Sequence, residues 1–255
     1  MGRPGCPASP AHGGVQILKE LYYTVADEVF AEFPGYVRGI VIARGLSNGP
    51  SPDELTSLLR GAEESLRREL GTGNPADHPR IASWREAFRK LGMKPAEFRS
   101  SIEAMARRVA KGHELPSINA LVDLGNALSL LHLLPCGGHS LDDVSGDIML
   151  RPARGDEVFV PFGETEAESP APREFIFAEG DQVLTRRWCW RQANHTLTLP
   201  ETRDFIFNVD GMPPVGADEV LEVCREMEEL MARFCGGDSF RTGLLSSGSP
   251  RASLS

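Results

Sequence analysis

The strongest constraint on the fold is a change of hydrophobic period near residue 147 of the 255-residue chain. Before that point, apolar residues recur at helical spacing over residues 55–70, 81–91, 95–112 and 117–134. After it, short apolar stretches alternate with polar residues and are cut by turn sequences, until a last helical stripe covers residues 218–234. Helices followed by a series of short strands predict an α+β fold with a mainly antiparallel sheet.

Strands are also expected before the first helix. Residues 22–30 and 36–46 are rich in β-branched and aromatic side chains and are separated by Phe33-Pro34-Gly35. A capping box, Ser51-Pro52-Asp53-Glu54, then predicts a helix start. The later strands are predicted at residues 147–153, 157–162, 174–178, 182–192, 195–199 and 204–209. We expect a single domain at 15–240 between disordered tails at 1–14 and 241–255, which are rich in Pro, Gly or Ser.

Charge and motifs narrow the functional classes. The net charge of −9 argues against a protein coated with basic residues, so any RNA contact needs a local patch and DNA is not an expected partner. Phosphate-cradling loops, the common metal-binding motifs and the nucleophile elbow are missing, which predicts no cofactor and no metal.

The five cysteines show no CxxC spacing, and no apolar stretch approaches the ~18 residues of a membrane span. A cytoplasmic protein is expected.

One such basic patch lies between residues 80 and 111. This segment carries nine basic residues against three glutamates, within an acidic chain. It could neutralise phosphates, or it could be the solvated outer face of two helices. The basic residues are Arg80, Arg85, Arg89, Lys90, Lys94, Arg99, Arg107, Arg108 and Lys111.

A second candidate is the Trp- and Arg-rich segment 185–192. If it is a strand, alternation places Arg186, Trp188 and Trp190 on one face and Arg187 and Arg191 on the other. The aromatic rings could stack on a base or an amino-acid ring while arginines hold phosphate. The alternative is a core strand whose arginines form structural ion pairs.

A third candidate is a polar line on the apolar helix predicted at 117–134. Asn119, Asp123 and Asn126 are spaced by four and three residues, so they share one helical face. They could serve chemistry, or they could cap neighbouring loops.

Together with the segments that follow it, this helix resembles the tRNA-binding and editing domain of the phenylalanyl-tRNA synthetase beta subunit, its third and fourth modules. The resemblance covers about residues 80–210, and free-standing versions of the domain resemble residues 22–237. The matching residues are Ser117-Ile118-Asn119, Val122-Asp123, Asn126, Pro135, Gly146-Asp147-Ile148, Leu150-Arg151, Ala153, Gly155-Asp156-Glu157, Phe177-Ala178-Glu179 and Thr202 to Phe207.

The resemblance implies a layered, mainly antiparallel β-sandwich flanked by helices, and hydrolysis of tyrosine wrongly attached to tRNA. Three pocket positions depart from the family pattern: Gly125 replaces Thr, Gly137 replaces His, and Asn208 replaces Glu, whereas Asn126 is retained. The catalytic modules of the synthetase are not matched, so aminoacylation is not expected.

These observations lead to one main hypothesis, a deacylase that removes wrong amino acids from tRNA in trans, with the aminoacylated 3′ end of tRNA as partner. Asn126 and Asp123 are the predicted catalytic residues. The predicted RNA-binding residues are Arg85, Arg186, Arg187 and Arg191, and the predicted pocket is formed by Asn119, Gly125, Gly137, Trp188, Trp190 and Asn208. The alternatives are a non-catalytic RNA- or tRNA-binding module with a degenerate pocket, and a metabolic small-molecule binder.

Overall fold

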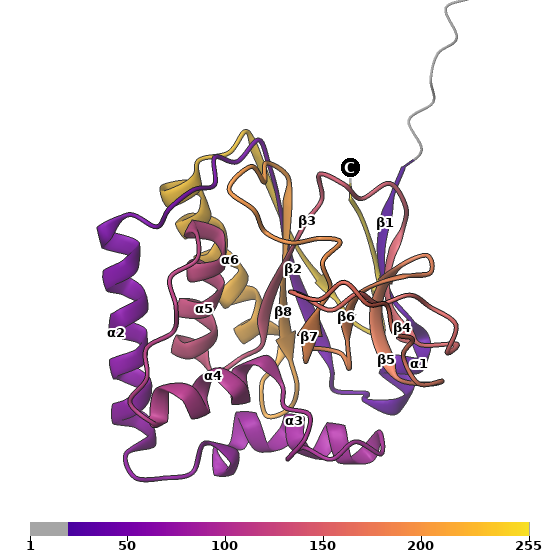
Figure 1. Ribbon diagram of the computed structural model, residues 1–255, viewed down its shortest axis with the longest axis horizontal. Helices are drawn as coiled ribbons and strands as arrows, with labels where there is room; N and C mark the ends of the chain where they lie inside the picture. Colours follow the sequence, from indigo (N-terminus) through magenta and orange to yellow (C-terminus); the bar gives the residue numbers. More distant parts are fainter. Residues whose placement is uncertain (1–19, 255) are drawn as a thin grey trace, which may run out of the picture.

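The computed structural model describes residues 20–254 and shows two sheets and a helical layer (Figure 1). The helices are α1 (Asp27–Glu32), α2 (Asp53–Leu70), the short 3-10 helix η1 (Pro75–Asp77), α3 (Pro79–Lys90), α4 (Ser101–Ala110), α5 (Ala120–His132) and α6 (Ala217–Cys235). The strands are β1 (Tyr22–Val25), β2 (Val37–Arg44), β3 (Cys136–Ser140), β4 (Ile148–Pro152), β5 (Phe175–Glu179), β6 (Gln182–Arg186), β7 (Arg191–Gln192), β8 (Phe205–Gly211), β9 (Ser239–Leu245) and β10 (Arg251–Ser253).

The strands form a six-stranded sheet of order β10-β1-β4-β5-β6-β7 and a four-stranded sheet of order β3-β8-β2-β9. All pairs among the named strands are antiparallel except β1 with β4. The four-stranded sheet lies between the helices α2, α5 and α6 and the other sheet (Figure 1). The predicted α+β class, with a layered and mainly antiparallel sandwich flanked by helices, is confirmed.

The central strand β2 explains how the layers are held together. Ile40 and Ile42 belong to the core shared with the six-stranded sheet, whereas Val41 and Ala43 belong to the core beneath the helices. Successive side chains of a strand point to opposite faces, so an apolar run without alternation suits a strand covered on both faces. The same reasoning applies to β8, which is buried along its whole length.

The C-terminal tail prediction was wrong for residues 241–254. These residues complete β9, which pairs with β2, and form β10, which pairs with β1. Both lie at sheet edges; β10 has only three residues, and β9 shows no regular alternation of apolar and polar residues that would reveal it. The predicted tail at 1–14 lies outside the described residues.

Several predicted boundaries also differ. The first strand ends at Val25, and α1 follows with Asp27 and Glu28 in its first turn, where carboxylates are favoured. Residues 157–162 and 195–199 form no named strand, whereas β3 was not predicted. The capping box is not made: the Ser51 hydroxyl instead donates to Asp123.

Candidate functional site

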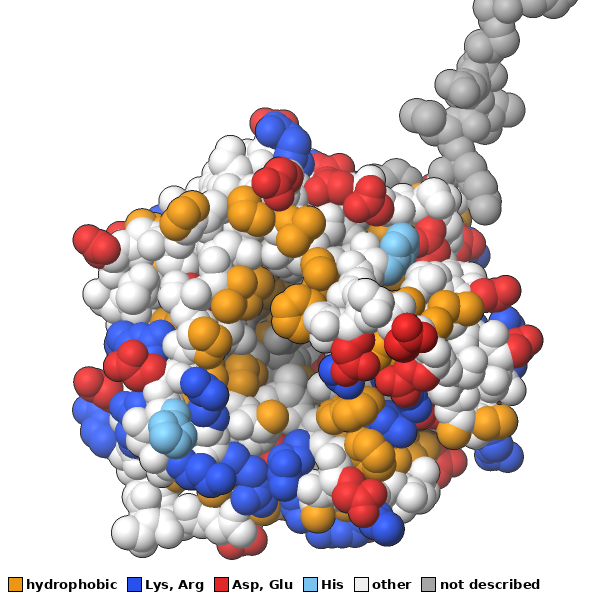
Figure 2. Space-filling model, viewed as in Figure 1, with side chains coloured by type: hydrophobic (Ala, Val, Ile, Leu, Met, Phe, Trp, Pro, Cys, Tyr) orange, Lys and Arg blue, Asp and Glu red, His pale blue; other side chains and the backbone are white. Residues whose placement is uncertain are grey.

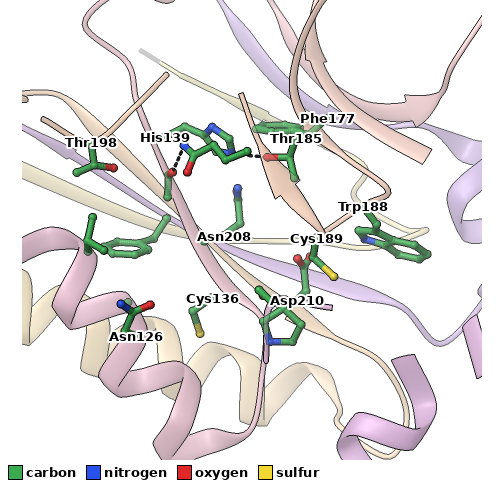
Figure 3. A pocket seen from close by; sticks show the side chains of 18 of the residues that line it. Asn126, Cys136, His139, Phe177, Thr185, Trp188, Cys189, Thr198, Asn208 and Asp210 are labelled. Atoms are coloured by element: carbon green, nitrogen blue, oxygen red, sulfur yellow. Dashed lines mark hydrogen bonds between the residues drawn. The ribbon is translucent and has the colours of Figure 1, made fainter. Parts of the chain in front are cut away.

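A cavity of about 230 Å³ opens between the two sheets at the side of α5. Its walls come from α5, β3, β8 and the β6–β7 hairpin, with Arg38 of β2 and Ser101 of α4 also contributing. Figure 2 shows it as a hollow near the middle of the face, and Figure 3 shows its side chains. Of the residues predicted for a site, Gly125, Asn126, Gly137, Trp188, Trp190, Arg191 and Asn208 line it.

Two residues of the polar line on α5, Asn126 and Asp123, have different environments. Asn126 lines the cavity, and within residues 20–254 no group forms a hydrogen bond with its side-chain amide. Asp123 is fully buried outside the lining, where it accepts from the Ser51 and Ser117 hydroxyls and from the Ile118 N–H. Asp123 therefore ties two loops to the helix and does not reach the cavity.

Asn119 is the N-cap of α5. Its side-chain oxygen accepts from the Val122 N–H at 3.1 Å, and its amide donates to the Thr198 carbonyl at 2.9 Å. Thr198 lines the cavity and Asn119 does not. The contacts of Asn119 and Asp123 therefore match the alternative in which these residues cap neighbouring loops.

The two glycines of the predicted pocket have different environments. A Cβ at Gly125 would lie 2.8 Å from a ring carbon of Phe207, so glycine permits close packing of α5 on β8. A Cβ at Gly137 would meet nothing within 4 Å. The missing side chain at Gly137 therefore leaves space in the cavity.

The floor of the cavity is a buried polar network. Asn208 and Asp210 point from β8 toward the six-stranded sheet, where the Tyr23 hydroxyl donates to Asn208 at 2.7 Å. Arg38 donates to both carboxylate oxygens of Asp210 and, through Nη1, to the Tyr23 hydroxyl. Burial raises the pKa of Tyr23, which keeps its hydroxyl available as a donor.

His139 also lines the cavity and was not predicted. It follows Gly137 by two residues on β3, so both lie on the same strand face. Its ring nitrogens lie 2.7 Å from the Thr196 hydroxyl and 3.3 Å from the Thr185 hydroxyl. Burial lowers the pKa of His139 to about 3, so this imidazole is neutral near pH 7. Strand alternation from Gly137 was the signal that could have identified it.

The strand predicted at 182–192 is a hairpin. Arg187 and Trp188 both adopt left-handed backbone conformations, with φ of 47° and 65°, and separate β6 from β7. The predicted common face of Arg186, Trp188 and Trp190 is therefore wrong, because a turn interrupts the alternation. The turn nevertheless brings both tryptophans to the cavity.

The predicted RNA-binding arginines are engaged within the protein. Arg186 is 4% exposed and donates to Glu174 and Glu168, so the structural ion-pair alternative describes it and no surface is left for phosphate. Arg85 pairs with the buried Glu103.

The other two arginines lie nearer the cavity. The Arg187 guanidinium lies 3.7 Å from the centre of the Phe98 ring and 4.4 Å from that of Trp190. Arg191 lines the cavity and pairs with the half-exposed Glu164 at 2.7 Å. Of the four arginines, Arg191 is therefore the one positioned to meet a bound molecule.

The thiols of Cys136 and Cys189 lie at the cavity as well. Burial raises the pKa of both thiols, which disfavours the thiolate that a nucleophile needs. Apart from Arg191 and the mutually paired Arg38 and Asp210, the polar side chains that line the cavity are thus amides, hydroxyls, an indole and a neutral imidazole.

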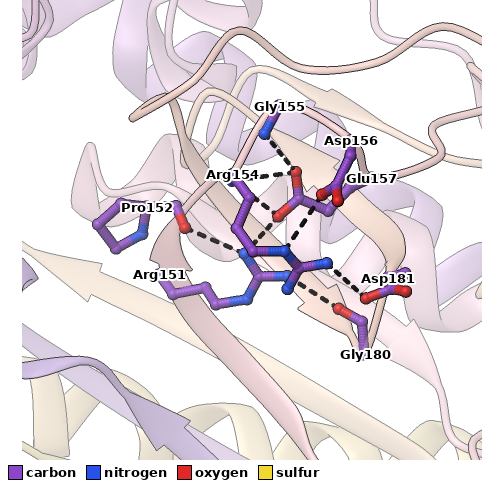
Figure 4. A network of polar contacts seen from close by, with 8 residues as sticks. All are labelled: Arg151, Pro152, Arg154, Gly155, Asp156, Glu157, Gly180 and Asp181. Carbon is purple, nitrogen blue, oxygen red and sulfur yellow. Dashed lines mark hydrogen bonds and ion pairs between the residues drawn. The ribbon is translucent and has the colours of Figure 1, made fainter.

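The segment from Arg151 to Glu157, part of the sequence resemblance, serves the fold (Figure 4). Glu157 is completely buried and accepts from the backbone N–H groups of Arg154 and Gly155 and from the Arg151 guanidinium. Burial alone would raise the pKa of Glu157, but these hydrogen bonds together lower it to about 2. The motif therefore locks a loop outside the cavity.

Among residues 20–254, no three His, Cys, Asp or Glu side chains are grouped so that they could hold a metal ion. No helix in the same range is both long enough and apolar enough to span a membrane.

The fold and cavity define an α+β domain of two packed sheets with a polar cavity between them. The family model described as the B3/4 domain matches residues 83–236, and the chain belongs to this family. Among solved structures, the chain is similar to an N-terminal fragment of the phenylalanyl-tRNA synthetase beta subunit from Pyrococcus horikoshii. The two are 13% identical with a TM-score of 0.44, over 86% of this chain and 50% of that one. The chain thus spans about half the length of that fragment. A search of curated proteins found no match.

Proposed function

We propose that this protein hydrolyses the ester bond of mischarged aminoacyl-tRNA in trans, with the aminoacyl group held in the cavity. The observation that carries the proposal is the free amide of Asn126, which faces a cavity that is also lined by uncharged hydrogen-bonding groups such as Asn208 and His139. The resemblance of the Asn119 to Glu157 segment to a tRNA editing domain, together with membership of the B3/4 family, supports the choice of substrate.

The reaction suits a site without a charged nucleophile. Water adds to the ester carbonyl carbon, and the carbonyl oxygen takes up the electron pair as an oxyanion. Collapse of this intermediate breaks the bond to the ribose oxygen, which receives the proton that the water loses. Asn126 can donate to the oxyanion and accept from the water, so positioning and electrostatic stabilisation suffice.

The cavity dimensions favour one small group. At about 230 Å³ it falls below the range typical of sites for drug-sized ligands. An aminoacyl group can enter while the ribose and the phosphates remain outside. We assign Asn126 the catalytic role, with Gly137, Trp188, Trp190 and Asn208 as pocket residues; Asp123 and Asn119 act indirectly, by holding the loops around α5.

A basic surface adjoins the mouth of the cavity. Figure 2 shows Lys and Arg side chains below the hollow, over the region of α4 in Figure 1, and acidic side chains at its right border. We define the basic α4 surface as Arg99, Arg107, Arg108 and Lys111. Arg99 and Arg107 pair with the buried Glu103, whereas Arg108 and Lys111 are exposed and form no ion pair with a described carboxylate. This surface and Arg191 are the proposed contacts for the terminal phosphates of tRNA.

The test is ester hydrolysis on a panel of substrates. tRNAs charged separately with each standard amino acid are incubated with the protein, and loss of the ester is followed against incubation without protein. Faster loss on at least one pairing is expected. Intact esters on every pairing would overturn the proposal, and binding of uncharged tRNA in that case would indicate the non-catalytic module.

A further inference from the structure

The indole of Trp188 is an unpaired donor at the cavity. Trp188 is 1% exposed and lines the cavity, and its Nε1 is fully buried without a hydrogen-bond partner in residues 20–254. A buried donor without a partner has lost its hydrogen bonds to water and gained none in the protein, so such atoms are few in native proteins. Figure 3 shows the indole nitrogen on the edge of the ring that faces the other cavity side chains.

The ring is held rigidly in this orientation. It packs edge-to-face against Tyr36 and Trp84, with centroids 4.8 and 5.2 Å away, and its backbone N–H donates to the Phe175 carbonyl. The left-handed conformation of Trp188 is unfavourable for an aromatic residue and persists because this packing determines it. The donor cannot readily turn away to find water.

The groups beside Trp188 indicate that the hydrogen-bond partner missing from its indole N–H is an uncharged acceptor. Arg38 and Asp210 satisfy each other through two hydrogen bonds, so their charges are balanced within the protein. The adjacent Cys189 thiol is a weak donor. This part of the cavity therefore offers an unmatched N–H without a net charge, which suits an uncharged oxygen acceptor.

We propose that Trp188 is a specificity-determining residue, whose indole N–H donates to a hydroxyl or carbonyl oxygen in the side chain of the bound amino acid. The site then prefers an oxygen-bearing aminoacyl group over its hydrocarbon counterpart. A site built to pair a polar group rejects the analogue that lacks it, because the protein donor is left unpaired. The inference rests on the proposed function for the identity of the ligand, but it concerns recognition and not hydrolysis.

The test uses 3′-aminoacylamino-3′-deoxyadenosines, in which an amide replaces the ester and prevents hydrolysis. Three pairs differ chiefly by one oxygen: seryl and alanyl, threonyl and valyl, tyrosyl and phenylalanyl. Calorimetry is expected to show that the oxygen-bearing member of at least one pair binds about tenfold more tightly. In Trp188→Phe, which lacks the N–H but keeps an aromatic ring, the preference should fall to about one.

Trp84→Phe is the matched control. It makes the same change within the same aromatic cluster but outside the cavity lining, so the preference should persist. A second measurement uses the wild-type protein, so that it does not depend on folding of the variant. The indole resonance assigned to Trp188 in a ¹H–¹⁵N spectrum should shift downfield with the oxygen-bearing analogue and not with its partner.

Three results would overturn the inference: absence of a preference in every pair, a preference unchanged in Trp188→Phe, or an indole resonance that does not respond. The last would show that the N–H does not meet the ligand. If the protein hydrolyses the ester but Trp188→Phe leaves the preference for the oxygen-bearing analogue unchanged, only this inference is rejected. Intact esters with a preference that depends on Trp188 would reject deacylation alone.

Discussion

Arg38 and Asp210 are direct cross-strand partners of β2 and β8, and they form a bidentate ion pair beneath the cavity. The Nε to Oδ1 distance is 2.6 Å and the Nη2 to Oδ2 distance is 2.9 Å. The Tyr36 hydroxyl also donates to Asp210. The strand register thus supplies a rigid polar floor on which the cavity is built.

Asp210→Ala should unfold much more easily than the wild type. It leaves the guanidinium of Arg38 buried and unpaired, which costs about 3–5 kcal/mol in comparable cases. Urea unfolding checks this. The double variant Arg38→Met with Asp210→Leu removes both charges and should recover most of the lost unfolding free energy. Equal unfolding free energies of the wild type, Asp210→Ala and the double variant would show that the ion pair is not buried in solution.

Asn126→Ala should reduce the rate of deacylation about 100-fold or more, as removal of one oxyanion donor does elsewhere, with tRNA affinity nearly unchanged. Rate and unfolding midpoint are measured on the same preparation. Asn74→Ala, on the exposed cap of η1, serves as the control and should retain full activity. A folded Asn126→Ala protein with wild-type turnover would remove Asn126 from the catalytic role.

Gly137→Val should abolish binding of the aminoacyl analogues without lowering the unfolding midpoint. The new side chain meets no protein atom near its Cβ and extends into the space that a ligand needs. Calorimetry and thermal unfolding test the two parts separately. Gly61→Ala, at another unobstructed glycine on α2, controls for the substitution of glycine itself. Unchanged binding in Gly137→Val would place the ligand elsewhere.

Arg108→Gln and Lys111→Gln should each weaken tRNA binding. Each lost phosphate contact reduces the slope of log affinity against log salt by ~0.7 to 0.9. Titrations at several salt concentrations measure this slope. Arg225→Gln removes an exposed charge from α6 and should leave the slope unchanged. Equal slopes in all variants would exclude the basic α4 surface as a phosphate contact.

Glu157→Gln should destabilise the protein in a pH-dependent way. The pKa of Glu157 is lowered from 4.5 to about 2 in the folded protein, so its carboxylate contributes stability above pH 4.5 that is lost as the pH falls toward 2. The difference in unfolding free energy from the wild type should be ~2–3 kcal/mol at pH 6 and should shrink progressively below pH 4.5.

The control for this pH dependence is Asp156→Asn, which changes the neighbouring exposed carboxylate. Its effect on the unfolding free energy should stay below ~1 kcal/mol throughout. A difference for Glu157→Gln that does not vary between pH 6 and pH 2 would contradict the proposed hydrogen bonding.

The elements predicted best from sequence are those with strong local signals. The leucine stripe of α2 and the apolar face of α6 define helices, and β2 was evident from its β-branched run. The edge strand β9 lacks such a signal, because its formation depends on the edge of β2 that it pairs with. The same holds for β3, which begins with Cys136 and two glycines.

The site was only partly predictable. Asn126 followed from helical spacing and resemblance, and it lines the cavity. The turn at Arg187 and Trp188 could not be foreseen, since left-handed conformations are rare for such residues. The partners of Arg186, Glu174 and Glu168, lie in the segment before β5, and the local pattern of residues 182–192 does not show that they reach it.

The pairing of β1 with β10 and of β2 with β9 has a consequence for the order of folding during synthesis. The first two strands, Tyr22–Val25 and Val37–Arg44, receive these antiparallel neighbours only from Ser239–Leu245 and Arg251–Ser253, about two hundred residues later. On the ribosome, both strands expose backbone groups and apolar surface until the last part of the domain emerges. Such long-range closure slows folding and leaves the nascent chain dependent on protection from aggregation.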